Sequence, residues 1–364
     1  MSEDDLLCSC NLDPEIRKSS MRFSFKVWSM ALAVSGILLT QAWCTAKAPN
    51  PGAQVFGKIP ATLAKNWDTS WRETSLSERI RPIDPIGIAY VAKWNELDGF
   101  DEKPQPAELT PERRAALIKE LENLPPYVKK FLEGNIAAIF TTRELGGSAM
   151  AGVAYNDSMQ PEFGFLFLDT EMFETPANEW ITAKEQTLFA PEAGKTFSIQ
   201  IEEPGSNTSA AGMRFILLHE LGHVASQLSH TMPPFTEEHL SLNSHFAKLS
   251  WTTPVVTRFD AEFPERGRVK FYRRPPPFPM SAAKDIYAKL AKTDLPTLYA
   301  CVDPHEDFAE TFALYIHTVL MKKPYTVRLI DSSGEQVLAR DRILLQALQK
   351  KRETIQGLLN NGWN

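Results

Sequence analysis

Cysteine is scarce in this chain, which has 4 cysteines among 364 residues. Three of them, Cys8, Cys10 and Cys44, precede a predicted processing site at Ala46. Removal of that region leaves only Cys301, so the mature chain has no internal disulfide and depends on its core for stability. We expect Cys301 to be a small buried residue rather than a reactive thiol. Cys8 and Cys10 make a weak metal pair, because no partner cysteines follow them.

An excess of positive charge is also missing. The net charge is −6, with 43% hydrophobic and 23% charged residues. This composition is typical of globular proteins and gives no indication of nucleic acid binding. One local basic cluster is expected to lie on a solvated loop face: Arg266, Arg268, Lys270, Arg273 and Arg274.

The N-terminal region has an apolar run, Val27 to Leu39, that is short for a stable membrane span. Arg22 and Lys26 precede it and small residues up to Ala46 follow, a pattern typical of a secretory signal peptide. We favour a cleaved signal over an uncleaved anchor. A membrane contact is expected only if this N-terminal segment stays uncleaved. The pattern therefore predicts export, to a bacterial periplasm or cell envelope or out of the cell.

The most informative motif is HELGH at residues 219–223. Residues four apart on a helix share a face, so the imidazoles of His219 and His223 can bind one zinc ion. Glu220 between them can act as a base on a water molecule. Residues 206–209 offer N-caps, and the residues after them are apolar on nearly every side, which predicts a buried helix. The alternative is a pair of core histidines that bond to backbone carbonyls.

A catalytic zinc ion usually has three protein ligands, so a third must come from elsewhere. The pattern HExxHxxGxxH fails, because Ser226 and Ser229 stand at its glycine and histidine positions. A glutamate spaced as in thermolysin-like enzymes would fall near Asn243, where no carboxylate lies. Glu237 and Glu238 are closer to the motif, but they follow two prolines in a predicted loop.

A second helix, predicted to begin with Asp303 as its cap and Pro304 in its first turn, supplies a better candidate. Glu306 and Glu310 are four apart and share a face of this helix. Glu306 could bind the metal, and Glu310 could accept a hydrogen bond from the outer nitrogen of a ligand histidine. In the alternatives, Glu306 completes a capping box with Asp303 and Glu310 pairs with an arginine.

With HELGH and the later EDFAE at residues 306–310, the chain resembles the gluzincin metallopeptidases. It is similar in particular to the family of the anthrax lethal factor catalytic domain. The resemblance implies one zinc ion, held by His219, His223 and Glu306, with Glu310 behind the ligands. It does not imply a substrate, because residues 251–279 between the motifs do not align.

The same resemblance implies an oxyanion-stabilising tyrosine seven residues before the ligand glutamate, and Tyr299 stands at that spacing. An ordinary core or surface tyrosine is the alternative. His305 is a rival for this role, although we expect it to be an exposed residue of the first helical turn.

The expected fold is of the α+β class: a zincin-like metallopeptidase domain with a small mixed sheet and the HExxH helix, preceded by a signal peptide or anchor. We divide the chain into an N-terminal extension with signal peptide or anchor (1–46), a linker and packing segment (47–109) and the metallopeptidase domain (110–364). Residues 48–60 should form an extended linker, and Pro82, Pro85 and Gly87 should break any long helix after it. Helices are predicted from Pro111, over 282–292 and over 337–359, and strands over 136–141, 152–155, 163–169 and 197–201. One of the last two strands should pair with an extended substrate.

We therefore predict a zinc-dependent peptidase acting on peptides or proteins, in which Glu220 takes a proton from water and passes it to the leaving amine. The alternative is a zinc-binding envelope protein without catalytic activity. A secreted protease acting on a host protein is a third reading. The oligomeric state, the substrate, and endo- versus exo-cleavage stay open.

Overall fold

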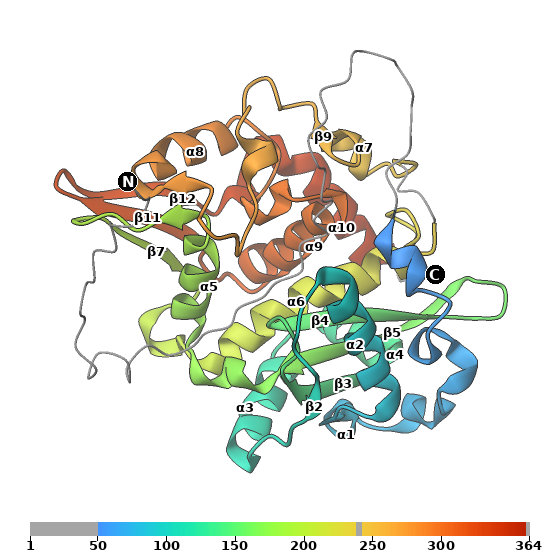
Figure 1. The fold of residues 1–364 in the computed structure, drawn as a ribbon. Helices are drawn as coiled ribbons and strands as arrows, with labels where there is room; N and C mark the ends of the chain where they lie inside the picture. The colour runs from blue at the N-terminus through green and yellow to red at the C-terminus, as the bar shows by residue number, and fades with distance from the viewer. Residues whose placement is uncertain (1–49, 238–241, 362–364) are drawn as a thin grey trace, which may run out of the picture.

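The computed structural model describes residues 50–237 and 242–361, and within them the chain forms a mixed α+β structure (Figure 1). The predicted signal peptide lies outside the described residues, so export remains a prediction. None of the described helices combines the length and the apolar character that a membrane crossing needs.

One half of the molecule is built on a five-stranded sheet in the order β1-β3-β5-β4, with β2 also paired to β3. Its strands are β1 (Ile80–Pro82), β2 (Gln105–Pro106), β3 (Ile136–Arg143), β4 (Ala149–Tyr155) and β5 (Pro161–Asp169). β1, β3 and β5 run parallel, and β4 is an antiparallel edge strand. β3 and β5 are buried on both faces, which explains their nearly continuous apolar sequences. The three predicted strands of this region are confirmed.

Four helices accompany this sheet: α1 (Leu76–Arg79), α2 (Pro85–Asp98), α3 (Pro111–Glu122) and α4 (Pro126–Asn135). The α3 prediction is confirmed, with Thr110 as its N-cap. The expected helix break is confirmed at Pro82, which belongs to β1, but it is wrong at Pro85 and Gly87, which lie in the first turn of α2. Asp84 caps α2 and Pro85 stands in the first turn, where its missing N–H is not needed. Gly87 is needed there for close packing, since a Cβ atom would lie 3.0 Å from the Phe167 ring.

The extended linker expected over 48–60 is also wrong for its described part. This segment forms short 3₁₀ turns, Pro51–Gln54 and Pro60–Thr62, and further turns follow at Ala64–Asn66 and Thr69–Glu73. Phe56 is buried, and its ring contacts the rings of Tyr90, Trp94 and Tyr155. Proline and glycine suggested a linker, but the apolar residues between them pack into the core.

The other half contains most of the remaining elements. Its helices are α5 (Ala177–Gln186), α7 (Ala247–Ser250), α8 (Ala283–Leu290), α9 (Pro304–Leu314) and α10 (Gln349–Asn361), and a π-helical turn over Tyr315–Leu320 continues α9. A three-stranded antiparallel sheet joins β7 (Thr196–Gln200), β11 (Thr326–Asp331) and β12 (Gly334–Arg340). The short pairs are β6 (Phe189–Ala190) with β10 (Phe278–Pro279), and β8 (Trp251–Thr253) with β9 (Val256–Thr257).

The single C-terminal helix expected over 337–359 is wrong in its first part. Residues 337–340 belong to β12, and the helix begins only at Gln349. The hairpin turn explains the difference. Gly334 has φ +105°, which suits glycine, and the Asp331 side chain accepts a hydrogen bond from the Ser333 N–H.

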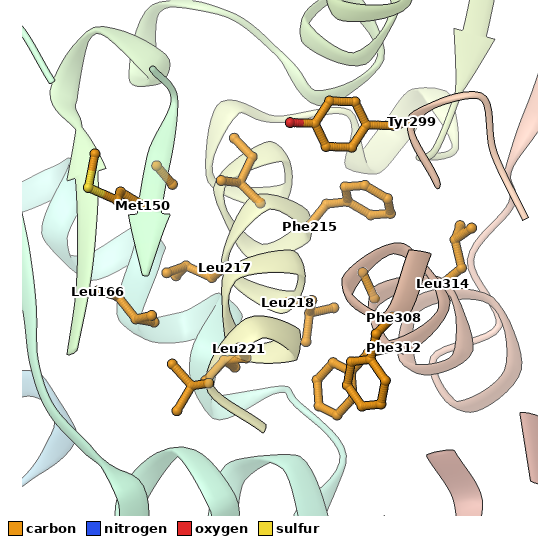
Figure 2. Close-up of a cluster of buried hydrophobic side chains, with 14 of the residues drawn as sticks. Met150, Leu166, Phe215, Leu217, Leu218, Leu221, Tyr299, Phe308, Phe312 and Leu314 are labelled. Atoms are coloured by element: carbon orange, nitrogen blue, oxygen red, sulfur yellow. The ribbon is translucent and has the colours of Figure 1, made fainter. Parts of the chain in front are cut away.

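Helix α6 (Ser209–Leu228), which carries HELGH, runs between the five-stranded sheet and α9 (Figure 1). Figure 2 shows Leu217 and Leu221 directed at Met150 and Leu166 of the sheet, while Leu218 faces α9. Burial on both sides explains why this helix is apolar all round, as predicted.

Gly222 lets α6 and α9 approach closely at the motif. A Cβ atom at this position would lie 2.8 Å from the Cα atom of Ala309. The glycine inside HELGH and the alanine inside EDFAE therefore bring the two helices together where their polar residues meet.

Buried ion pairs hold α9 and its surroundings in place. The Lys351 ammonium of α10 lies 2.6 Å from both carboxylate oxygens of Asp307, which also accepts a hydrogen bond from the Trp251 indole. The expectation of a solvated basic cluster is confirmed for Arg268, Arg273 and Arg274, which are exposed, but it is wrong for Arg266. Arg266 is buried, pairs with Asp260 and donates to the Cys301 carbonyl. Cys301 is buried as expected.

Candidate metal centre

The structure brings His219 and His223 of α6 together with Glu306 of α9, and their ligand atoms all lie within 4.8 Å of one another. The two Nε2 atoms are 3.2 Å apart. Glu306 Oε2 is 3.0 Å from Nε2 of His219 and 3.7 Å from Nε2 of His223. Ligand atoms bound 2.0–2.1 Å from a tetrahedral ion lie about 3.3 Å from one another. The three spacings bracket that value.

The chemistry of this set also suits a cation. Two imidazole nitrogens that face each other repel unless a proton or a metal ion lies between them. The Oε2 atom of Glu306 is buried and has no hydrogen bond of good geometry. A zinc ion would satisfy all three atoms.

The capping alternative for Glu306 is not what the geometry favours. The Asp303 side chain accepts hydrogen bonds from the N–H groups of His305 and Glu306, as expected of an N-cap. The Glu306 carboxylate lies against the histidines rather than turning back to the cap. Of the rival carboxylates, Glu237 is not part of the cluster, and Glu238 lies outside the described residues.

Glu310 lies behind His219, in the position the resemblance implies. Its Oε1 atom is 3.0 Å from Nδ1 of His219, and its Oε2 atom accepts a hydrogen bond of 2.7 Å from the Thr297 hydroxyl. Its cationic partner is Lys184, whose Nζ atom is 3.5 Å away, and not an arginine. A carboxylate on the outer nitrogen fixes the orientation of the ring and leaves Nε2 free to bind.

The two histidines differ in pKa because their surroundings differ in charge. Burial lowers the pKa of His219, but the contacts with Glu306 and Glu310 outweigh it and raise this pKa to about 10. Burial lowers the pKa of His223 to about 4. Near neutral pH the metal-free protein therefore favours a protonated, positively charged His219 and a neutral His223.

We expect zinc binding to release at least one proton at pH 8, because a ligand histidine must be neutral and His219 is protonated below its pKa of about 10. As the pH rises toward that pKa, proton competition weakens, and the zinc affinity should rise about tenfold per pH unit. Calorimetric titrations in buffers of different ionisation enthalpy measure the released protons. Zero protons released at pH 8 would mean that His219 is neutral in the metal-free protein.

Glu220 lies beside the ligands and lines the same pocket. Burial raises its pKa to about 7, although nearby His219 and a hydrogen bond with the Ala151 backbone lower it. A carboxyl group that titrates near neutrality can both accept and return a proton. This placement suits the role of general base.

Tyr299 lies beside His219, with its ring centroid 5.6 Å from the His219 ring. Burial keeps its pKa well above the ordinary value, so the phenol is neutral and can donate a hydrogen bond. The Lys184 Nζ atom sits 3.6 Å from the centroid of the same ring. Its rival His305 is not exposed as expected: it is buried against Phe235, and burial lowers its pKa to about 3.

These residues line a pocket with a cavity volume of about 90 Å³ that is open to solvent. The sequence did not reveal three residues of this lining. Lys184 stands on a helix with no motif, and its partner Glu310 is far away in the chain. Asn50 and Phe56 reach the pocket from the segment expected to be a linker. A lysine or a phenylalanine alone carries no signal for such a role.

The expectation that the strand over 163–169 or the strand over 197–201 pairs with substrate is not supported by their positions. β5 is an interior strand between β3 and β4, and β7 belongs to the other sheet. The edge strand that lines the pocket is β4, through Ala149 and Ala151. The sequence predicted this strand only over 152–155, so Ala149 and Ala151 were not recognised as part of it.

Comparisons with models of protein families, with curated proteins and with solved structures found no match to this chain.

Proposed function

We propose that the protein is a zinc-dependent peptidase of the zincin-like, gluzincin type, similar to the family of the anthrax lethal factor catalytic domain. One observation carries the proposal: two imidazole nitrogens and one carboxylate oxygen stand 3.0–3.7 Å apart, with Glu220 beside them and Glu310 behind. Three protein ligands with an open fourth position are typical of catalytic zinc sites, whereas structural sites are closed by four.

His219, His223 and Glu306 would hold the ion. When bound, it supplies an electrophile that acidifies a water molecule and polarises the substrate carbonyl. Glu220 takes the proton of the attacking water and passes it to the leaving amine. The neutral hydroxyl of Tyr299 donates a hydrogen bond to the oxygen that becomes negative.

The pocket supports this function over that of an inactive zinc-binding protein. A site that only stores or structures zinc has no need of a base whose pKa is near 7 or of an aromatic pocket open to solvent. Export and a location in the cell envelope remain part of the proposal.

The test is metal content together with hydrolysis. The purified protein, supplied with zinc and then freed of excess metal, should contain one zinc ion per chain and cleave members of a mixed peptide library. A chelator should stop cleavage, and added zinc should restore it. A folded protein that takes up no zinc would overturn the proposal. Bound zinc without cleavage of any peptide would favour the inactive zinc-binding protein.

A further inference from the structure

The outer edge of β4 limits how a peptide can lie beside the metal centre. The Ser148 carbonyl accepts a hydrogen bond from the Asp169 N–H, so this pair faces inward to β5. Backbone groups alternate in direction along an antiparallel strand. The register with β5 therefore turns the N–H and C=O groups of Ala149, Ala151 and Val153 outward.

Beyond Ala149 these outward groups are already used or covered. The Tyr90 hydroxyl of α2 donates a hydrogen bond of 2.9 Å to the Ala151 carbonyl, and the Ala151 backbone also bonds to Glu220. Val153 is fully buried, and Tyr155 forms a parallel bridge with Leu63. An extended peptide can pair with β4 at Ala149, but it cannot continue past Ala151, which is level with the catalytic base.

A wall of aromatic side chains closes the pocket on this side. Phe56 lies edge-on against Trp94 at 5.8 Å and stacks on Phe235 at 4.8 Å, and all three line the pocket. Hydrogen bonds also hold this wall in place. The Asn50 side-chain amide donates to the backbone carbonyls of Phe235 and Glu237 at 2.9 and 2.7 Å. The cleft therefore ends close to the metal centre on the side of this wall.

A carboxyl group beside the wall, that of Asp303, indicates which end of a peptide fits there. Burial and the nearby Glu306 raise its pKa to about 7, and a bound ammonium group favours its charged form. Asp303 lines the pocket two residues before His305, whose ring packs on Phe235. Its Oδ1 atom accepts both capping hydrogen bonds, while its Oδ2 atom accepts none from the described residues. Among the described residues, Lys184 is the one lysine that lines the pocket, and it is paired with Glu310, so within this part of the chain a peptide's terminal carboxylate finds no unpaired lysine there. A free carboxylate oxygen suits an α-ammonium group.

We propose that the protein is an exopeptidase that removes residues from free amino ends, with the wall closing the cleft and Asp303 binding the α-ammonium group. This inference rests on the proposed peptidase function. It makes Asp303 a substrate-binding residue in addition to a helix cap.

The test uses one leucine-rich hexapeptide in four forms: both ends free, acetylated amino end, amidated carboxyl end, and both ends blocked. With zinc-loaded protein, we expect the first residue to be released from the free and the amidated forms at similar rates. Acetylation should lower kcat/KM about 10- to 100-fold, since it removes a charged hydrogen bond and must fit against the wall. Mass spectrometry of the products identifies the bond that is cut.

Asp303→Asn tests the binding residue without removing the cap, because asparagine is an equally good N-cap. It should raise KM for free amino ends about tenfold, leave zinc content unchanged and reduce the preference for free over acetylated peptide. Asp84→Asn is the matched control, since Asp84 also caps a helix that begins with proline but does not line the pocket. It should leave these constants unchanged.

Two kinds of result would overturn the inference while the peptidase function stands. One is internal cleavage of the doubly blocked peptide as fast as the free form is cut, or release of residues from the carboxyl end. The other is an Asp303→Asn variant with unaltered preference for free amino ends. If zinc-loaded protein cleaves none of the four forms or any library peptide, the proposed function fails and this inference fails with it.

Discussion

Replacing Glu220 with glutamine should lower peptide hydrolysis by about 10²- to 10⁴-fold while zinc stays bound. Glutamine has the size of glutamate but cannot take a proton from water or return it to the leaving amine. Glu220 is not one of the three clustered ligand atoms, so its replacement should leave the zinc content at one ion per chain. The measurement is kcat on a cleaved peptide, with zinc determined in the same sample.

Glu122→Gln provides the matched control for this variant, because Glu122 is exposed on α3 and does not line the pocket. The control should keep full activity. Hydrolysis by Glu220→Gln at the rate of the control would remove Glu220 as the base. Loss of zinc in Glu220→Gln would instead show that this residue supports the metal, and would assign it a different role.

The centre was predictable from the sequence because both of its helices carry local signals. His219 and His223 stand one turn apart in an apolar helix, and Asp303 with Pro304 marks where the second helix begins. These signals depend on helix geometry alone. They were enough to select Glu306 and Glu310 over nearer carboxylates.

Other parts of the fold were not predictable, because distant contacts decide them. Phe56 is buried by Tyr90, Trp94 and Phe235, none of which its own segment reveals. Lys184 gains its role only when α5 packs beside Glu310. Local patterns report helix faces and caps, but they do not report which surface a loop covers or which strand ends a sheet.

Replacing Glu306 with alanine should weaken zinc binding by more than about 100-fold. Mutation of a residue that only hydrogen-bonds to a metal ligand typically costs about 10- to 100-fold in affinity. The substitution leaves two ligands, and the two histidine nitrogens 3.2 Å apart then have no carboxylate to complete the set. Competition with a chromogenic chelator measures the zinc dissociation constant. Circular dichroism of the same samples separates loss of metal from loss of fold.

Two companions to Glu306→Ala make the comparison specific. Glu310→Gln keeps the ligand atoms and removes the negative charge behind Nδ1 of His219, which also pairs with Lys184, so it should weaken zinc binding about 10- to 100-fold. Glu237→Ala removes the rival carboxylate, which is not part of the cluster, and should leave the affinity unchanged. The expected order of effects is therefore Glu306, then Glu310, then Glu237. If Glu306 were only a helix cap, its variant would lose about 1 kcal/mol of stability and keep its zinc. A larger loss in Glu237→Ala would move the third ligand to the loop after α6.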